Sequence, residues 1–300
     1  MKDKKILVIG SSNTDMTIKS DKLPLPGETI LGGKFIMGPG GKGANQAVAA
    51  RRLGGKVEFV CKVGRDIFGK NSLEGYVKEG IDMSHILYSD EASGIALILV
   101  DGNGENMISV APGANSDLTV EDIESIADTI RESDYLILQL EIPVSSVLRA
   151  AEIAHEAGVY VILNPAPACQ QPSELFRFIS LITPNQTETS LMTGIEITDE
   201  SSCMEAVKVL NEMGVKDVVI TLGSKGSLVI SEGNCKMVPA QKVKAVDATA
   251  AGDTFCGALC VALSKGSGLI EAAEFATKAS ALTVQKIGAQ NSIPHITDIK

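Results

Sequence analysis

The chain of 300 residues is 44% hydrophobic but only 4% aromatic, and it has no tryptophan. A core built mainly from Ala, Val, Ile and Leu is typical of helices packed on a parallel sheet, and this composition excludes a disordered chain. The 37 acidic and 27 basic residues give a net charge of −10 without a basic cluster, so we expect no nucleic-acid partner. No apolar run approaches the roughly 20 residues of a membrane span, so we expect no membrane partner either.

Short β-rich apolar runs alternate with segments of helical period along the chain. The predicted strands are residues 4–10, 56–64, 134–141, 159–167, 175–185 and 216–226. The predicted helices are residues 43–54, 66–80, 144–158, 201–214, 252–263 and 270–286. Repeated strand–helix–strand units predict an α/β fold with a central, mostly parallel sheet and helices on both faces.

Two segments, 14–37 and 93–115, break this alternation. Both read as short alternating strands with Pro or Gly-Asn turns, which do not suit a sheet covered by helices. We expect them to pair into a small separate β-sheet that forms a lid on a single domain spanning residues 1–300.

The six cysteines stand at positions 61, 169, 203, 235, 256 and 260, form no Cys-x-x-Cys pair and lie in apolar segments. Nothing at the N-terminus resembles a signal peptide, so we predict buried free thiols in a reducing cytoplasm. Cys256 and Cys260 have the spacing of two ligands on one helix. Because no His or third Cys lies nearby in the sequence, we favour a structural role for the pair.

Polar residues and glycines follow the predicted strands, at the edge where ligands bind in an open parallel sheet. They are Asn13, Asp15, Glu141, Asn164, Asn185, Glu188, Ser224 and Gly226. Any one of them could be a helix cap or a turn residue. Together, on one edge of one sheet, they indicate a ligand site.

The segment GPGGKGANQAVAARRLG contains a GxGxxG pattern at Gly38, Gly40 and Gly43. A dinucleotide-binding loop should follow the first strand directly, and a P-loop should have Ser or Thr where Gly43 stands, so neither fits. What remains is a glycine turn into a helix N-terminus, with Lys42 and Asn45 facing the opening. Such a turn suits a polyhydroxylated or anionic ligand, and the alternative is a flexible loop with a solvated lysine.

The segment VDATAAGDTFCGALCVAL places Asp253 after the small residues Ala250, Ala251 and Gly252 and at the start of a helix. Small side chains let backbone N–H groups approach an anion, while a carboxylate beside them can take a proton from a hydroxyl nucleophile. The alternative is an ordinary first-turn Asp on a packed helix, which leaves the small residues unexplained.

These motifs resemble the ribokinase family of sugar kinases, which also includes adenosine kinase and fructokinases. The resemblance covers nearly the whole chain and rests on NTD with LPLPGET, GGKGANQAVAARRLG, QLEIP, NPAPA, TPNQTE, ITLGSKG and DATAAGDTFCGAL, in family order. It implies an α/β domain with a small β lid, ATP with Mg²⁺ as phosphoryl donor, activation by a monovalent cation such as K⁺, and a homodimer formed through the lids.

The resemblance also implies roles for individual residues. Those matching the sugar site are Asn13, Asp15, Gly41, Lys42, Asn45 and Glu141, with Asp253 as catalytic base and Ala250, Ala251 and Gly252 as the anion hole. Those matching the nucleotide site are Asn185, Thr221, Gly223, Ser224, Gly226, Gly252 and Thr277, with Glu188 near Mg²⁺ through water. Those matching the K⁺ site, largely through backbone carbonyls, are Asp247, Thr249, Thr283, Lys286, Gly288 and Ser292.

The chain departs from the family pattern at Ala248, where Thr is common, and at Ala250, where Gly is common. Alanine is small enough that we expect activity to survive. The chain ends at Lys300, so we also expect a terminal helix of some relatives to be missing.

The implied reaction is transfer of phosphate to O5 of D-ribose, which gives ribose 5-phosphate. Asn13 and Asp15 favour a substrate with adjacent free hydroxyls, but deoxyribose, fructose and adenosine stay open as alternatives. A non-catalytic sugar-binding regulator is a third hypothesis, and it is disfavoured because a pure binder needs neither Asp253 nor Glu188.

Overall fold

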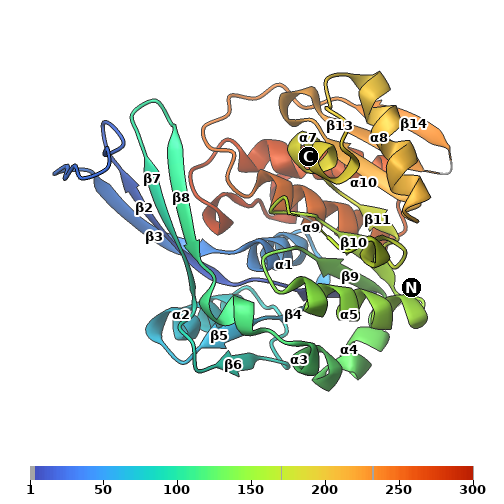
Figure 1. Cartoon of the computed structure of the whole chain (residues 1–300), viewed down its shortest axis with the longest axis horizontal. Coiled ribbons are helices and arrows are strands. Elements are labelled where there is room, and N and C mark those ends of the chain that lie inside the picture. Colours follow the sequence, from blue (N-terminus) through green and yellow to red (C-terminus); the bar gives the residue numbers. More distant parts are fainter. Residues whose placement is uncertain (1–3, 170, 232, 300) are drawn as a thin grey trace.

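The computed structural model describes residues 4–169, 171–231 and 233–299, and its centre is an eight-stranded sheet (Figure 1). The strand order is β14-β13-β12-β11-β10-β9-β1-β4. These strands are β1 (Lys5–Ile9), β4 (Lys56–Val60), β9 (Tyr135–Leu138), β10 (Tyr160–Leu163), β11 (Leu181–Ile182), β12 (Asp217–Thr221), β13 (Ser227–Ser231) and β14 (Asn234–Val238). All neighbours from β4 to β12 pair in parallel, and β13 pairs antiparallel with both β12 and β14.

Helices cover both faces of this sheet, which confirms the predicted fold class (Figure 1). They are α1 (Lys42–Arg52), α2 (Ile67–Lys78), α3 (Val120–Ser125), α4 (Ala127–Arg131), α5 (Val144–Glu156), α6 (Ser173–Phe176), α7 (Gln186–Thr193), α8 (Glu200–Glu212), α9 (Ala251–Ser264) and α10 (Leu269–Thr283), with 3₁₀ turns η1 (Gly113–Asp117), η2 (Gly223–Lys225), η3 (Gln290–Ser292) and η4 (Ile296–Asp298).

Alternate side chains of β1, which lies next to the edge strand β4, pack into two separate cores. Ile6 and Val8 of β1 pack with α1, α9 and α10, whereas Leu7 and Ile9 pack with α3 to α6 and α8 on the other face. All four side chains are fully buried. This is why the run is continuously apolar: a strand covered on both faces buries every side chain.

A second sheet stands apart from the first and carries both irregular segments (Figure 1). Its order is β3-β2-β7-β8, formed by β2 (Asn13–Lys19), β3 (Lys34–Gly40), β7 (Gly94–Val100) and β8 (Asn106–Ala111). The separate sheet is therefore confirmed. We call these four strands the lid.

Two strand predictions were wrong in detail, and one hairpin was missed. The predicted strand 56–64 breaks after β4, because β5 (Lys62–Gly64) pairs instead with β6 (Leu87–Ser89) in a two-stranded sheet. In the predicted strand 175–185 the first residues form α6, and only the short β11 is extended. The antiparallel hairpin of β13 and β14 was not predicted. A continuous apolar run indicates that its residues are buried, but it does not show which strand they pair with or whether they form a strand or a helix. Sequence periodicity therefore missed these three features.

The prediction of uniformly buried thiols was also wrong at two positions. Cys235 is exposed on β14 and Cys169 is half-buried, whereas the other four cysteines are buried and all six are free. Cys235 lies on an edge strand whose residues are mostly exposed, and that strand was not predicted. Within residues 4–169, 171–231 and 233–299, no helix has both the length and the hydropathy to cross a bilayer.

The chain order of the strands determines where a ligand can bind. From β1 the chain continues to β4 on one side, and it later returns to β9 on the other side of β1. A crevice therefore opens outside the carboxyl ends of β1 and β9, where the direction of winding reverses. Helices α1 and α9 pack against each other beside this crevice (Figure 1).

The contact between α1 and α9 depends on a glycine. A Cβ at Gly257 would lie 2.8 Å from the Ala49 Cβ and 2.8 Å from the Gln46 carbonyl oxygen. We expect Gly257→Ala to lower the free energy of unfolding by about 1–3 kcal/mol, because the helices would have to separate. The matched control is Gly75→Ala on α2, where a Cβ meets nothing within 4 Å.

That control should raise the free energy of unfolding by about 0.5–1 kcal/mol, the ordinary gain for Gly→Ala in a helix. Urea unfolding of both variants gives the comparison. Equal effects of the two substitutions would contradict the close approach of α1 and α9.

Candidate active site

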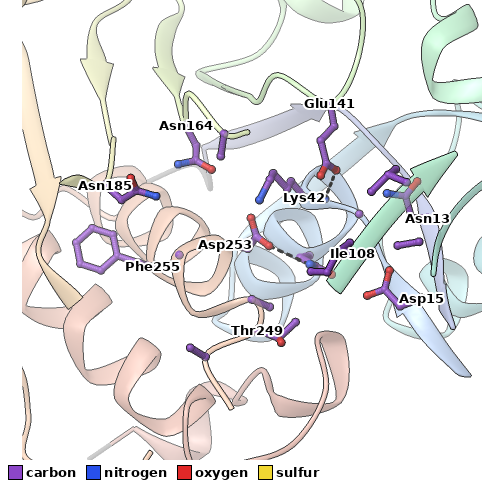
Figure 2. Close-up of a pocket in the computed structure, with 18 of the residues that line it drawn as sticks. Asn13, Asp15, Lys42, Ile108, Glu141, Asn164, Asn185, Thr249, Asp253 and Phe255 are labelled. Atoms are coloured by element: carbon purple, nitrogen blue, oxygen red, sulfur yellow. Dashed lines mark hydrogen bonds between the residues drawn. The ribbon is translucent and has the colours of Figure 1, made fainter. Parts of the chain in front are cut away.

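A pocket of about 390 Å³ lies at the carboxyl ends of the main-sheet strands, beside the lid (Figure 2). It brings together most of the predicted sugar and catalytic residues, which come from segments far apart in the sequence. Its lining includes Asn13, Asp15, Gly41, Lys42, Asn45, Glu141, Asn164, Asn185, Glu188, Thr221, Ala250, Gly252 and Asp253. Figure 2 shows Asn13 and Asp15 on one side of Asp253, with Asn164 and Asn185 on the other.

Asp253 lies in the first turn of α9 and is 7% exposed. Its Oδ2 accepts a hydrogen bond of 2.9 Å from Nδ2 of Asn45, and its Oδ1 accepts one of 3.0 Å from Nε2 of Gln46. Burial raises the pKa of this carboxyl above its usual value, while the charge on Lys42 and these two donors act against the rise. Asp253 is therefore a carboxylate of raised basicity in a pocket, as a general base requires.

The turn before Asp253 presents backbone amides to the pocket. Ala250 has φ 60° and ψ 10°, a left-handed conformation that is strained for a residue with a Cβ. The amide of Ala251 donates to the carbonyl of Ala248 over 3.1 Å, and no side chain of the described residues caps the helix. The first-turn amides of Gly252 and Asp253 are thus available to an anion.

Four carboxylates of the pocket act on the charge of Lys42. Burial opposes its charge, but Asp253, Glu141, Glu188 and Asp15 outweigh this effect and raise the pKa of Lys42. The side chain therefore stays protonated and partly neutralises an acidic pocket. Glu141 also fixes the start of α1, because its Oε2 accepts a 3.0 Å hydrogen bond from the Lys42 amide (Figure 2).

Asp15 and Asn13 stand at the start of lid strand β2. Burial, together with the charges of Glu141 and Asp253, raises the pKa of Asp15 to about 6, although Lys42 acts in the opposite direction. Asn13 is buried, and its Oδ1 accepts a 2.7 Å hydrogen bond from Nδ2 of Asn115. The amide group of Asn13 thus keeps its N–H donors for a ligand, while Asp15 supplies acceptors.

Asn185 and Glu188 form a reciprocal cap at the start of α7. The Glu188 amide donates to Oδ1 of Asn185 over 2.8 Å, and the Asn185 amide donates to Oε2 of Glu188 over 2.8 Å. Burial raises the pKa of Glu188, while the Asn185 amide and Lys42 lower it. The capping role explains the spacing of the two residues, but both also line the pocket, where Glu188 has a second carboxylate oxygen.

The other predicted nucleotide residues lie outside this lining. Gly223, Ser224 and Gly226 belong to or follow the exposed turn η2, next to the pocket residue Thr221. Thr277 is buried in α10, where its hydroxyl donates 2.8 Å to the Ala273 carbonyl. Their assignment to a nucleotide stays a prediction.

Hydrogen bonds connect three of the predicted K⁺ residues, namely Asp247, Thr249 and Gly288. The Asp247 carboxylate accepts hydrogen bonds from the Thr249 amide over 2.9 Å, the Thr249 hydroxyl over 2.6 Å and the Gly288 amide over 2.9 Å. Burial opposes the charge of Asp247, but these bonds outweigh it and lower its pKa.

The three other members of the predicted K⁺ set lie within five residues of Gly288 in the sequence. The buried Thr283 bonds to Thr254 and accepts the Lys286 amide through its carbonyl, whereas the Lys286 side chain is exposed. Ser292 is buried and bonds to the carbonyl of Ala289.

The structure adds site residues that the sequence analysis missed. Gln46 contacts Asp253 directly, and the structure buries it fully. The signal available in the sequence was a polar Gln among the apolar residues of GANQAVAA. Ile98, Ile108 and two further lid residues line the pocket, because alternate residues of β7 and β8 face it. Which of the alternating residues face the pocket depends on how the lid strands pair, and the sequence did not supply that pairing.

The donor set of the pocket fits Mg²⁺ only with help from a ligand. Among residues 4–169, 171–231 and 233–299, no three His, Cys, Asp or Glu side chains are close enough to hold a metal ion by themselves. Mg²⁺ in proteins keeps several waters and is held by one or two carboxylates together with phosphate oxygens. Glu188, with one carboxylate oxygen outside its capping bond, fits that mode.

The raised pKa of Asp15 provides a direct test of this arrangement. We expect its carboxyl to titrate near pH 6 in carbon-13 NMR spectra, and to titrate at lower pH in Glu141→Gln, because one repelling charge is removed. The control is Glu124→Gln on the surface helix α3. A titration of Asp15 that is unchanged by Glu141→Gln would contradict the shared pocket.

Sequence and structure comparisons place the chain among known proteins. It matches the profile of the pfkB family of carbohydrate kinases over residues 3–296. It is 44% identical to a ribokinase of Haemophilus influenzae (97% of this chain, 95% of that protein) and 34% identical to a deoxyribokinase of Salmonella typhi (97% and 96%). The structure of Arabidopsis thaliana ribokinase complexed with ribose and ATP superimposes with a TM-score of 0.91 at 32% identity, covering 100% of this chain and 98% of that one. The chain belongs to the pfkB family of carbohydrate kinases.

Proposed function

We propose that the protein transfers the γ-phosphate of ATP to O5 of D-ribose, giving ribose 5-phosphate and ADP. The observation that carries the proposal is the position of Asp253. It lies at the helix tip with open amides, between the hydroxyl-binding groups Asn13 and Asp15 and the polar edge formed by Asn185 and Glu188. The comparisons support ribose and ATP, since the relatives include ribokinases across nearly the full chain.

Asn13, Asp15, Lys42 and Asn45 hold the sugar by its hydroxyls, with O5 toward Asp253. As the O5–phosphorus bond forms, the O5 proton passes to the Asp253 carboxylate. The bond from phosphorus to the β-phosphate oxygen breaks, and ADP leaves. The amides of Gly252 and Asp253 donate to the phosphoryl oxygens where charge accumulates. The lid excludes water, so that ATP is not hydrolysed.

We assign the nucleotide to the remaining predicted groups. Asn185, Thr221, Gly223, Ser224, Gly226 and Thr277 would hold ATP, and Glu188 would hold Mg²⁺ through a water molecule. When bound, Mg²⁺ neutralises charge on the phosphate oxygens. ATP is an intracellular metabolite, so we place the reaction in the cytoplasm.

Replacing the base tests the chemistry. We expect Asp253→Asn to lower turnover by about 10²- to 10⁴-fold, because the amide keeps the shape but accepts no proton. The measurement is ADP release with ribose at saturation, with the exposed surface variant Asp128→Asn as control. Near-normal turnover of Asp253→Asn would remove the proposed mechanism.

The same assay compares substrates. Deoxyribose is the nearest alternative, because a deoxyribokinase is among the relatives, and fructose and adenosine are the others. A panel of the four substrates identifies the preferred acceptor. Binding of sugar without any ADP release would instead favour the non-catalytic regulator.

We also propose K⁺ as an activator, held by carbonyls of the segment around Asp247 and Thr249 and of the segment from Thr283 to Ser292. What supports this is the Asp247 carboxylate, which joins the two segments through Thr249 and Gly288. The Asp247 segment leads directly into the anion turn at Ala250. An ion bound there would therefore stabilise the amides that receive phosphate.

We expect Asp247→Ala to lose the stimulation by K⁺, because the carboxylate that holds Thr249 and the Gly288 amide is removed, while the backbone bonds from residues 246 and 247 to the Val284 carbonyl remain. Turnover is measured over a KCl series, with choline chloride holding ionic strength constant. Asp128→Ala is the control for removing a surface carboxylate. A wild-type K⁺ response in Asp247→Ala would contradict this assignment.

Dimerisation through the lid is the last part of the proposal. The lid face turned away from the pocket carries Phe35, Met37, Leu97 and Met107, each 50–59% exposed. An exposed apolar sheet face of this kind marks an interaction site, and a second copy would cover it.

We expect sedimentation to give twice the mass of one chain for the native protein and a single mass for Leu97→Glu. Val77→Glu, on an exposed part of α2, is the control and should stay dimeric. A monomeric native protein would refute the dimer.

A further inference from the structure

A chain of buried amide side chains runs behind Asp253. Nε2 of Gln139 donates to Oε1 of Gln46 over 2.7 Å, and Nε2 of Gln46 donates to Oδ1 of Asp253 and to Oδ1 of Asn164, both over 3.0 Å. Gln46 and Gln139 are fully buried. We propose that this amide pair is a positioning device that keeps Asp253 ionised and aimed at the substrate, an inference that rests on the proposed role of Asp253 as base.

The hydrogen bonds permit only one orientation of the Gln46 amide. A glutamine amide has one acceptor oxygen and two N–H donors, and all three are used here, by Gln139, Asp253 and Asn164. Turned over, its oxygen would face two acceptor oxygens, and its NH₂ would face that of Gln139. Asn164 is itself fixed, because its Nδ2 donates 2.9 Å to the Thr183 carbonyl.

Gln139 holds the Gln46 amide at a cost in folding free energy. Its Oε1 is buried and has no hydrogen-bond partner among the described residues, which is a cost to folding. Its neighbours Leu138 and Leu140 are apolar and buried. A Cβ at position 10 would lie 1.9 Å from that oxygen, so Gly10 leaves the space that the amide fills. Leucine at position 139 would avoid the unpaired oxygen but would release Gln46.

The consequence is electrostatic. Burial favours the protonated form of Asp253, which cannot act as a base. Donors from Gln46 and Asn45, one to each carboxylate oxygen, favour the ionised form, because hydrogen bonds to a charged acceptor are the stronger ones. Each oxygen retains acceptor capacity for the sugar hydroxyl. Gln139 contributes by holding Gln46 in the donating orientation.

The test measures turnover as a function of pH. Gln46→Met and Gln139→Met keep the side-chain volume but remove the amide. We measure kcat from pH 5.5 to 9 at saturating ribose and MgATP, with melting temperatures as a check on folding. The control is Ser146→Ala, which loses another fully buried hydrogen bond, from Ser146 Oγ to the Leu118 carbonyl on the opposite face of the sheet.

We expect Gln46→Met to lower kcat about 10- to 100-fold at neutral pH, the loss of one hydrogen bond to a charged group. The acidic limb of the profile should move to higher pH, so that the loss shrinks as pH rises. Gln139→Met should give a smaller loss with the same pH dependence and an unchanged KM for ribose, since Gln139 does not line the pocket. Ser146→Ala should follow the wild-type profile.

If Gln46→Met does not fold, Gln139→Glu carries the test. The carboxylate is isosteric and attracts the NH₂ of Gln46, which turns the oxygen toward Asp253 and moves the acidic limb to higher pH. A wild-type profile for the Gln139 variants, or a loss that is equal at every pH, would overturn the proposal. Asp253→Asn in the same assay separates the two hypotheses. If the Gln139 variants give an overturning result and Asp253→Asn is inactive, only the role of the amide pair is refuted. If Asp253→Asn is active, the role of Asp253 as base is refuted.

Discussion

One buried carboxylate sets the requirements for the rest of the molecule. Moving an ion such as that of Asp253 out of water costs several kcal/mol unless partners replace the solvent. The fold supplies the Asn45 and Gln46 donors, the ammonium of Lys42 and the positive end of α9. Two hydrogen bonds to a charged group contribute about 3–6 kcal/mol together, which is of the size of the penalty. The carboxylate stays buried and remains more basic than an exposed one.

The architecture supplies these partners through one helix contact. Helices α1 and α9 lie side by side (Figure 1), with Gly257 permitting close approach. Their N-termini therefore meet at the crevice beside β1 and β9. One brings Lys42, Asn45 and Gln46, and the other brings Asp253 with its open amides. The lid strands then add Asn13 and Asp15 from the far side (Figure 2). Asp253, the side chains that support it and the groups proposed to bind the sugar hydroxyls come from separate elements, so the fold is needed to bring them together.

Much of this arrangement was predictable from the sequence, for physical reasons. Fully apolar strands alternating with amphipathic helices specify a sheet covered on both faces, and polar residues after those strands must meet at one edge. Asp253 was identifiable because small residues precede it. The amide chain was not, since Gln139 and Gln46 are 93 residues apart and only the packing brings them together. The break after β4 and the short β11 were missed because an apolar run does not say which strand it pairs with.

The central claim concerns the distance from one carboxylate to one hydroxyl. A crystal structure with ribose and a non-hydrolysable ATP analogue measures it directly. The account predicts O5 of the sugar within about 2.6–3.2 Å of an Asp253 oxygen, with the γ-phosphate against the amides of Gly252 and Asp253. A ternary complex in which O5 lies beyond hydrogen-bond reach of Asp253, with another side chain in contact with it, would contradict the account.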